Sequence, residues 1–303
     1  MRVIPPLVIT DAILTSSTAA EPGTGEAAYN AATTYALNAT VSVIGANSHH
    51  VYQSLQAGNI GNAPATSPLW WFDLGPTNRW KMFDLLRNTQ TVSVSPLTVV
   101  LTPGIRVNSL AMMGMLADSV TVSITSGGVN VYTKTTSLNL RNVVDWYTYF
   151  FEPFSTNPNL IDFDIPPITN SIITITLASS TGSVSCGSLI IGNAEYLGDA
   201  QYTAKSDTIN FSSVTRDVFG NATMVPRRSI PKTTQTLWLD KARVNRADAV
   251  RESLNSVPAV WSGLDDANDG YFDALFVLGF YRAFSFDIDY PTAALVNLEI
   301  EEI

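Results

Sequence analysis

Charged residues, cysteine and histidine are all scarce in this chain of 303 residues. Asp, Glu, Lys and Arg make up 14% of the sequence, against about 25% in an average soluble protein, while 46% is hydrophobic. So few charges indicate more apolar surface than one folded monomer needs to bury. Obligate subunit interfaces are the usual place for such surface, so the composition favours a homo-oligomer or a larger assembly.

Cysteine and histidine are too few for the chemistry that they usually support. Cys186 is the single cysteine, which excludes an intrachain disulfide framework and a thiolate metal cluster within one chain. It lies in the apolar-polar stretch SVSCGSLII, and because free cysteine is often buried we predict a buried thiol on a strand. The two histidines, His49 and His50, are adjacent, and neighbouring residues on a strand point to opposite faces. Two such residues cannot easily share a metal ion, so we expect no metal and no cofactor. We predict that both histidines lie in a loop.

No catalytic motif is visible either. Both histidines stand together without a nucleophile motif, and acidic residues are scarce before the C-terminal region, so neither a Ser-His-Asp triad nor a glycosidase carboxylate pair stands out. The acidic loop Leu264–Asp273 fails the EF-hand pattern, because Phe276 occupies the position of the bidentate glutamate. We therefore predict no catalytic residues and do not expect an enzyme.

Long apolar runs are absent, and the balance of charge is acidic. The longest helix-compatible run, Leu110–Ala117, falls far short of the roughly 20 residues of a membrane span, so none is predicted. The net charge of -9 argues against nucleic acid as a partner. Eight basic and three acidic residues lie in Arg216–Arg251, whereas Trp261–Ile303 holds nine acidic residues and one basic residue, Arg282. These blocks either attract each other, within a subunit or across a ring, or are ordinary solvated faces.

Alternating apolar and polar residues predict an all-β protein, an antiparallel β-sandwich or jelly roll with a small aromatic-rich β module. Val120–Leu138 predicts a hairpin around Gly127-Gly128, and Ser171–Leu177 with Ser185–Ile191 predicts a second hairpin. Helical spacing predicts one helix near residues 242–256, ended by Pro258.

Four regions follow from this organisation. We predict that an N-terminal strand segment, 1–26, packs on the C-terminal region, and that 27–80 forms the small aromatic-rich, carbohydrate-binding-like module. A jelly-roll-like sandwich is expected over 81–200, and a C-terminal β region with the helix over 201–303.

The aromatic residues of region 27–80 have a spacing similar to that of small chitin-binding modules of bacterial chitinases. The resemblance implies sugar-stacking rings at five aromatic positions. Tyr replaces the leading Trp of that pattern, and Leu37-Asn38 replaces its Gly-Asp. A module this small also needs aromatic residues for its own core. The candidate glycan-binding residues are Tyr29, Tyr35, Tyr52, Trp70 and Trp71.

The segment Trp70–Asp84, WWFDLGPTNRWKMFD, combines a turn with three of the chain's 6 Trp residues. Such a segment suits a rigid docking surface. It resembles a string in tail proteins of long-tailed, siphovirus-type bacteriophages, and shorter strings in the same order extend the resemblance. They include Asp217–Asn221, Leu237–Asp240, Phe280–Phe284 and the Leu298–Glu301 terminus. Ala283 stands where that family usually has Asp.

The resemblance implies a structural protein of the virion tail tip or baseplate, made in the bacterial cytoplasm. It would assemble with other tail proteins, in a ring of copies, and contribute to host attachment. Trp80, Arg79 and Arg282 are the expected docking or structural residues. The alternatives are a glycan-binding adhesin that recognises host envelope polysaccharide and, less favoured by the residues, a depolymerase.

Overall fold

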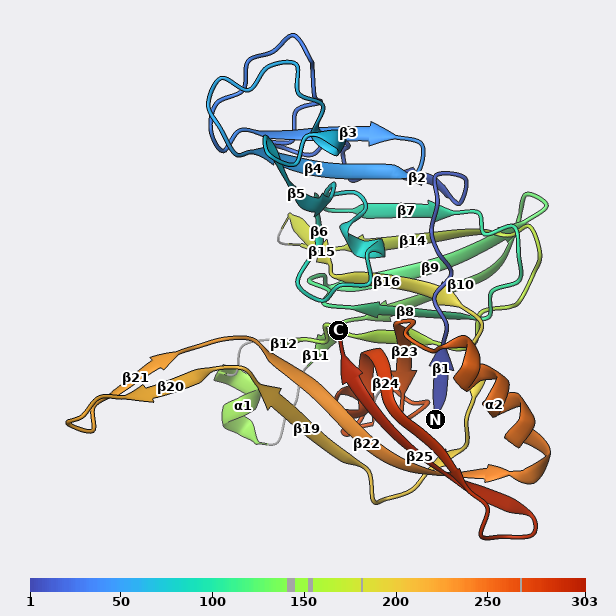
Figure 1. Cartoon of the computed structure of the whole chain (residues 1–303). Coiled ribbons are helices and arrows are strands. Elements are labelled where there is room, and N and C mark those ends of the chain that lie inside the picture. Colours follow the sequence, from blue (N-terminus) through green and yellow to red (C-terminus); the bar gives the residue numbers. More distant parts are fainter. Residues whose placement is uncertain (141–144, 152–154, 181, 268) are drawn as a thin grey trace.

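Antiparallel strands build most of the molecule, which confirms the prediction of an all-β, sandwich-like fold (Figure 1). The computed structural model describes residues 1–140, 145–151, 155–180, 182–267 and 269–303. Three sheets stack in the body of the molecule, and the small module projects at one end (Figure 1).

The first layer is a five-stranded sheet whose strands alternate between buried and partly exposed residues. This alternation follows from the two-residue repeat of a strand and places one face on the core. The buried side chains include Val122, Ile124, Ile173 and Ile175, which belong to the largest apolar cluster of the chain. In spatial order the strands are β10 (Val129–Ser137), β9 (Ser119–Ser126), β14 (Ile172–Ala178), β7 (Leu97–Leu101) and β2 (Leu14–Ser17).

The second layer is a three-stranded sheet that is buried on both faces. Leu110 and Met112 face the five-stranded sheet, whereas Ala111 and Met113 belong to a second apolar cluster shared with the C-terminal sheet. Continuous apolar sequence is the expected signature of strands that are covered on both sides. This internal sheet therefore uses part of the chain's high apolar content. Its strands are β13 (Leu160–Asp162), β8 (Ser109–Met113) and β16 (Ser188–Gly192).

The third layer is the C-terminal sheet. Helix α2 (Val244–Ser253) packs on the face of this sheet that is turned away from the internal sheet. Ala247, Val250 and Leu254 of the helical region join Trp261 and Val277 of the sheet in one apolar cluster. The predicted helix near residues 242–256 is therefore confirmed. In spatial order the strands are β17 (Glu195–Tyr196), β1 (Arg2–Ile4), β23 (Ala259–Ser262), β24 (Phe276–Asp287), β25 (Ala293–Glu302), β22 (Ser229–Asp240) and β18 (Asp199–Ala200), and β19 (Lys205–Asn210) also pairs with β22.

The remaining elements are short. The module holds a sheet of β3 (Thr40–Gly45), β4 (Ser48–Ser54) and β5 (Trp71–Pro76). Three two-stranded pairs are β6 (Thr91–Val94) with β15 (Ser183–Cys186), β11 (Asn139–Leu140) with β12 (Ser155–Thr156), and β20 (Ser213–Arg216) with β21 (Ala222–Val225). Helix α1 is Trp146–Phe151, and single 3-10 turns lie at Pro64–Thr66, Lys81–Phe83, Lys241–Arg243 and Asp273–Leu275.

One predicted hairpin forms and the other does not. β9 and β10 pair around Gly127-Gly128, both with positive φ, as the sequence predicts. The second predicted hairpin is wrong: β14 pairs with β9 and β7, whereas β15 pairs with β6 and β16 with β8. The chain crosses here from the five-stranded sheet to the internal sheet, so its two apolar runs cover opposite sides of one core.

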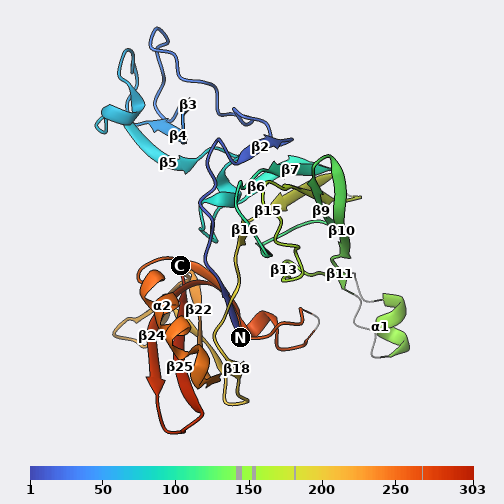
Figure 2. The same ribbon diagram turned by 90° about the vertical axis from the view of Figure 1, so that its right-hand side faces the viewer.

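The N-terminal segment divides between two sheets. β1 pairs with β23 and β17 in the C-terminal sheet, but β2 pairs with β7 of the five-stranded sheet. The chain leaves the C-terminal sheet after Ile4 and continues to the five-stranded sheet (Figure 2). The segment thus joins both halves of the body.

Candidate functional site

Three of the candidate glycan-binding rings pack against one another inside the module. The rings of Tyr29 and Tyr35 stack with centroids 5.9 Å apart, and Trp71 meets them edge-on at 6.0 Å and 5.2 Å. The indole N–H of Trp71 donates to the carbonyl of Asn62 at 2.9 Å, and Trp71 is only 3% exposed. These rings therefore supply much of the interior of a module that has few other large side chains to bury.

The other two candidate rings lie apart from this trio. Tyr52 is half-buried on β4, near His50 at a centroid distance of 6.2 Å and opposite Asp73 on β5. Partial burial, with a smaller contribution from the charge of Asp73, raises the pKa of Tyr52. Trp70 is also half-buried, and its carbonyl accepts the N–H of Leu55. The five predicted glycan-binding residues thus do not form one continuous surface on which a sugar could stack.

Trp80 and Arg79 lie where the module meets the N-terminal segment. The indole ring of Trp80 stacks on the imidazole of His49, with centroids 4.3 Å apart. Arg79 donates to the carbonyl of Ala19 at 2.9 Å and lies 3.5 Å from the buried carboxylate of Glu21. Both predicted docking residues therefore have a structural role at this junction.

His49 is the centre of the junction, and sequence reasoning missed this role. Its Nδ1 is 2.9 Å from Glu21 Oε1, and its Nε2 is 2.6 Å from Asp11 Oδ1. Each ring nitrogen of His49 thus faces a carboxylate oxygen at hydrogen-bond distance. Backbone donation from Asn47, and then His49, lowers the pKa of Asp11.

The predicted loop at His49-His50 is wrong, since both residues lie within β4. Strand geometry directs the two rings to opposite faces. His49 therefore binds the N-terminal segment, while His50 reaches Asp73 of the neighbouring strand at 3.1 Å. The partners of His49 lie 38 and 28 residues earlier in the chain, and no local pattern links them.

Arg282 lies on the exposed side of β24 and stabilises the C-terminal sheet. It donates two hydrogen bonds to Glu301 of β25, at 2.6 Å and 3.1 Å, and its guanidinium lies over the Phe280 ring. The bond to Arg282 is the main cause of the lowered pKa of Glu301. The strand register shifts between Tyr281 and Ala283, which is a β-bulge at Arg282.

The oppositely charged blocks meet within the subunit. Arg228 pairs with Glu302 at 2.7 Å, and Lys232 pairs with Glu299 at 2.7 Å, across the β22–β25 region. Intrasubunit attraction therefore accounts for part of the charge pattern that the sequence shows. Cys186 is buried on β15, as predicted, and burial raises its pKa to about 12.

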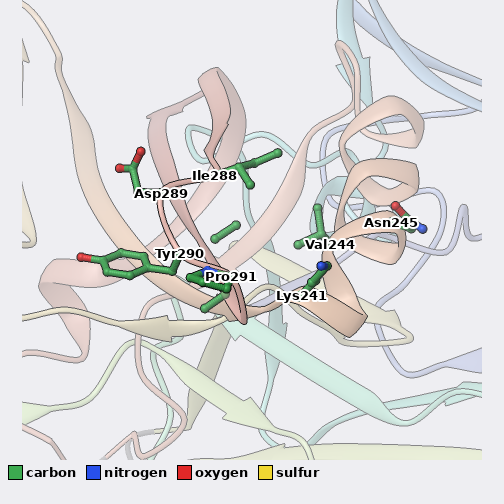
Figure 3. Close-up of a pocket in the computed structure, with 9 residues that line it drawn as sticks. Lys241, Val244, Asn245, Ile288, Asp289, Tyr290 and Pro291 are labelled. Atoms are coloured by element: carbon green, nitrogen blue, oxygen red, sulfur yellow. The ribbon is translucent and has the colours of Figure 1, made fainter.

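A groove of about 530 Å³ lies between the start of α2 and the turn that joins β24 to β25 (Figure 3). Ile288 points towards the helix, where Val244 faces it, whereas Asp289 and Asn245 point away from each other (Figure 3). Tyr290 turns to the other side, against Trp238 at 4.9 Å. The polar groups do not converge on one point, so the groove suits an apolar side chain better than a reacting substrate.

Within the described part of the chain, no cluster of His, Cys, Asp and Glu has the arrangement of a metal site. None of the described helices is long and apolar enough to cross a membrane. Comparison with models of protein families and with curated proteins gives no match for this chain.

Proposed function

We propose that this chain is a structural subunit of a bacteriophage tail tip or baseplate, assembled with other tail proteins and with copies of itself. The proposal rests on one observation above the others. Large apolar side chains remain exposed at three separate places outside the packed layers: on the module, on α1 and on the β20–β21 hairpin.

These exposed side chains are too numerous for a monomer that works alone. The module exposes Leu69 and Phe72, α1 exposes Trp146 and Phe151, and the hairpin exposes Phe219. Monomeric soluble proteins rarely expose contiguous apolar patches of more than a few hundred Å², and larger ones mark interaction sites. A subunit with several neighbours accounts for several such places at once. The low charge content and the resemblance of Trp70–Asp84 to phage tail proteins support the same class.

Antibody labelling of purified virions, viewed by negative-stain electron microscopy, tests the proposal. We expect label at the distal end of the tail. The same antibody, preabsorbed with the purified chain, is the control and should leave the particles unlabelled. Virions that contain the chain elsewhere, or that lack it, would contradict a tail-tip location.

A second candidate is a glycan-binding adhesin, and Tyr52 is the residue that favours it. Its ring remains partly exposed beside the polar side chains of His50 and Asp73, an arrangement that suits a sugar ring. A pull-down on envelope polysaccharide of the host tests this role. Loss of retention in Tyr52→Ala, with an unchanged melting temperature, would support the adhesin. Equal retention of Tyr52→Ala and the unmodified chain would exclude Tyr52 as the contact.

A further inference from the structure

The β20–β21 hairpin leaves the C-terminal sheet and stands free of the rest of the described chain. β19 and β22 are paired along Lys205–Asn210 and Ser229–Thr234, and beyond them the chain continues as a two-stranded arm (Figure 1). We call residues 211–228 the arm. Among the described residues β20 and β21 pair only with each other, and no residue of the arm is buried. A two-stranded hairpin without a packed face is marginally stable alone in water.

The tip of the arm is nevertheless held in one conformation. Asp217 Oδ1 accepts the backbone N–H of Phe219 at 2.9 Å and that of Asn221 at 2.8 Å, and Asp217 Oδ2 accepts the Asn221 side-chain amide at 2.9 Å. Arg216 donates to the carbonyl of Gly220. This ordered turn presents Val218, 94% exposed, and Phe219, 87% exposed. A preorganised apolar tip loses little conformational entropy on binding, as a docking element requires.

The groove at the start of α2 lies at the opposite end of the same strand. β22 begins at the base of the arm (Figure 1) and ends at Asp240, next to Lys241 of the groove's rim. Twelve residues of strand separate the two features by about 40 Å. The arm therefore cannot reach the groove of its own subunit. Ile288, 79% exposed, and Pro291 line the groove together with Val244.

Charge also fits the arm to this groove. The hairpin region 205–228 holds four basic and two acidic residues in a chain with a net charge of -9. No described residue pairs with the guanidinium of Arg227 or with the carboxylate of Asp289 on the groove's rim. Asp287 adds a second negative charge at the same turn. The arm thus carries a net positive charge, mostly at its base, while the turn beside the groove carries two carboxylates against Lys241 of the rim.

We propose that the tip of the arm of one copy docks into the groove of a second copy, with Phe219 lying against Ile288. The contact joins two different surfaces, so it is heterologous, and its repetition forms a ring when the rotation between copies closes. It gives the marginal hairpin the packed face that it lacks. The inference deepens the proposed structural role by naming the contact through which copies associate.

Directed disulfide cross-linking in the full chain tests the contact. Phe219→Cys and Ile288→Cys chains are purified separately, mixed and oxidised. Cys186 does not interfere, because it is fully buried. We expect a covalent dimer in the mixture on a non-reducing gel. The matched control replaces Ile288→Cys with Val129→Cys, a 64% exposed position on the β9–β10 turn, and should give at least tenfold less dimer.

A second measurement keeps the test decisive if oxidation is inefficient. Sedimentation of Phe219→Ser and Asp289→Lys should show lower association than the unmodified chain, whereas Val129→Ser should leave association unchanged. Equal cross-linking in the control mixture, or unchanged association in both variants, would overturn the docking contact. The proposed tail-tip location would survive that result, since it depends on where antibody labels the virion.

Discussion

The internal sheet and the arm use similar residues in opposite ways. Every residue of β8 and β16 is buried, and both faces of these strands are covered by other sheets. β20 and β21 carry apolar residues too, yet neither strand has a buried residue. The chain therefore places apolar residues both where its own layers meet and where, we propose, another copy arrives. Composition alone does not distinguish these two uses.

Thiol reactivity should separate the two regions by the largest factor. Burial raises the pKa of Cys186 on β15 to about 12, so at pH 8 about one thiol in ten thousand is ionised. A cysteine at the arm tip, Phe219→Cys, has an ordinary pKa and free access. We expect the arm thiol to react with a disulfide reagent at least about a thousandfold faster than Cys186. Comparable rates would show that the core opens readily.

Two methionines provide a matched comparison of packing. Met112 is 0% exposed on β8, and Met224 is 72% exposed on β21. Met112→Ala removes buried methylenes and leaves a cavity, so it should lower the free energy of unfolding by about 2–5 kcal/mol. Met224→Ala should change it by less than about 0.5 kcal/mol. Denaturant titration followed by circular dichroism measures both, and a large effect of Met224→Ala would mean that the arm packs within the subunit.

The adjacent histidines provide the same kind of comparison at the module junction. His49 contacts two carboxylates and the Trp80 ring, with 11% of its side chain exposed, whereas His50 is 42% exposed and contacts one. His49→Asn should lower the free energy of unfolding by about 1–3 kcal/mol, because the buried carboxylate of Glu21 loses one of its partners. His50→Asn should have an effect below about 1 kcal/mol. Thermal melts at neutral pH check the order, and equal effects would contradict the junction role.

Acid should loosen the arm tip before the body. Hydrogen bonds from Asn221, the side chain first, lower the pKa of Asp217 below its unfolded value near 3.8. A lowered folded pKa means that this stabilisation is present above pH 4 and is lost as the pH falls through the folded value. Amide hydrogen exchange at Phe219 should therefore show weaker protection at pH 2.5 than at pH 5, after correction for intrinsic rates. Asp217→Asn should remove most of that difference, while Asp207→Asn on β19 should not.

Local patterns predicted the elements whose partners are close in the sequence. The β9–β10 hairpin needs only alternation around Gly127-Gly128, and α2 needs only helical spacing before Pro258. Both signals lie within the element itself, so one stretch of sequence contains them. The burial of Cys186 was predictable from its residue type, since free cysteine is often buried.

Predictions failed where the chain passes from one layer to the next. Ile172–Ala178 and Ser188–Gly192 have the same strand chemistry, so the sequence did not show that they belong to different sheets. The same limit applies to His49, whose carboxylate partners come from the N-terminal segment. Alternation predicts a strand and its buried face, but it carries no information about which distant strand covers that face.

The amino-acid sequence by itself determined that this protein is β-rich, weakly charged, free of an intrachain disulfide framework and provided with an aromatic module. These properties follow from residue types and short-range spacing. Only the tertiary structure decided that one sheet is buried on both faces, that His49 joins the module to the N-terminal segment, and that an arm and a groove lie at opposite ends of β22. Those features depend on contacts between residues far apart in the chain, which form only when the layers stack.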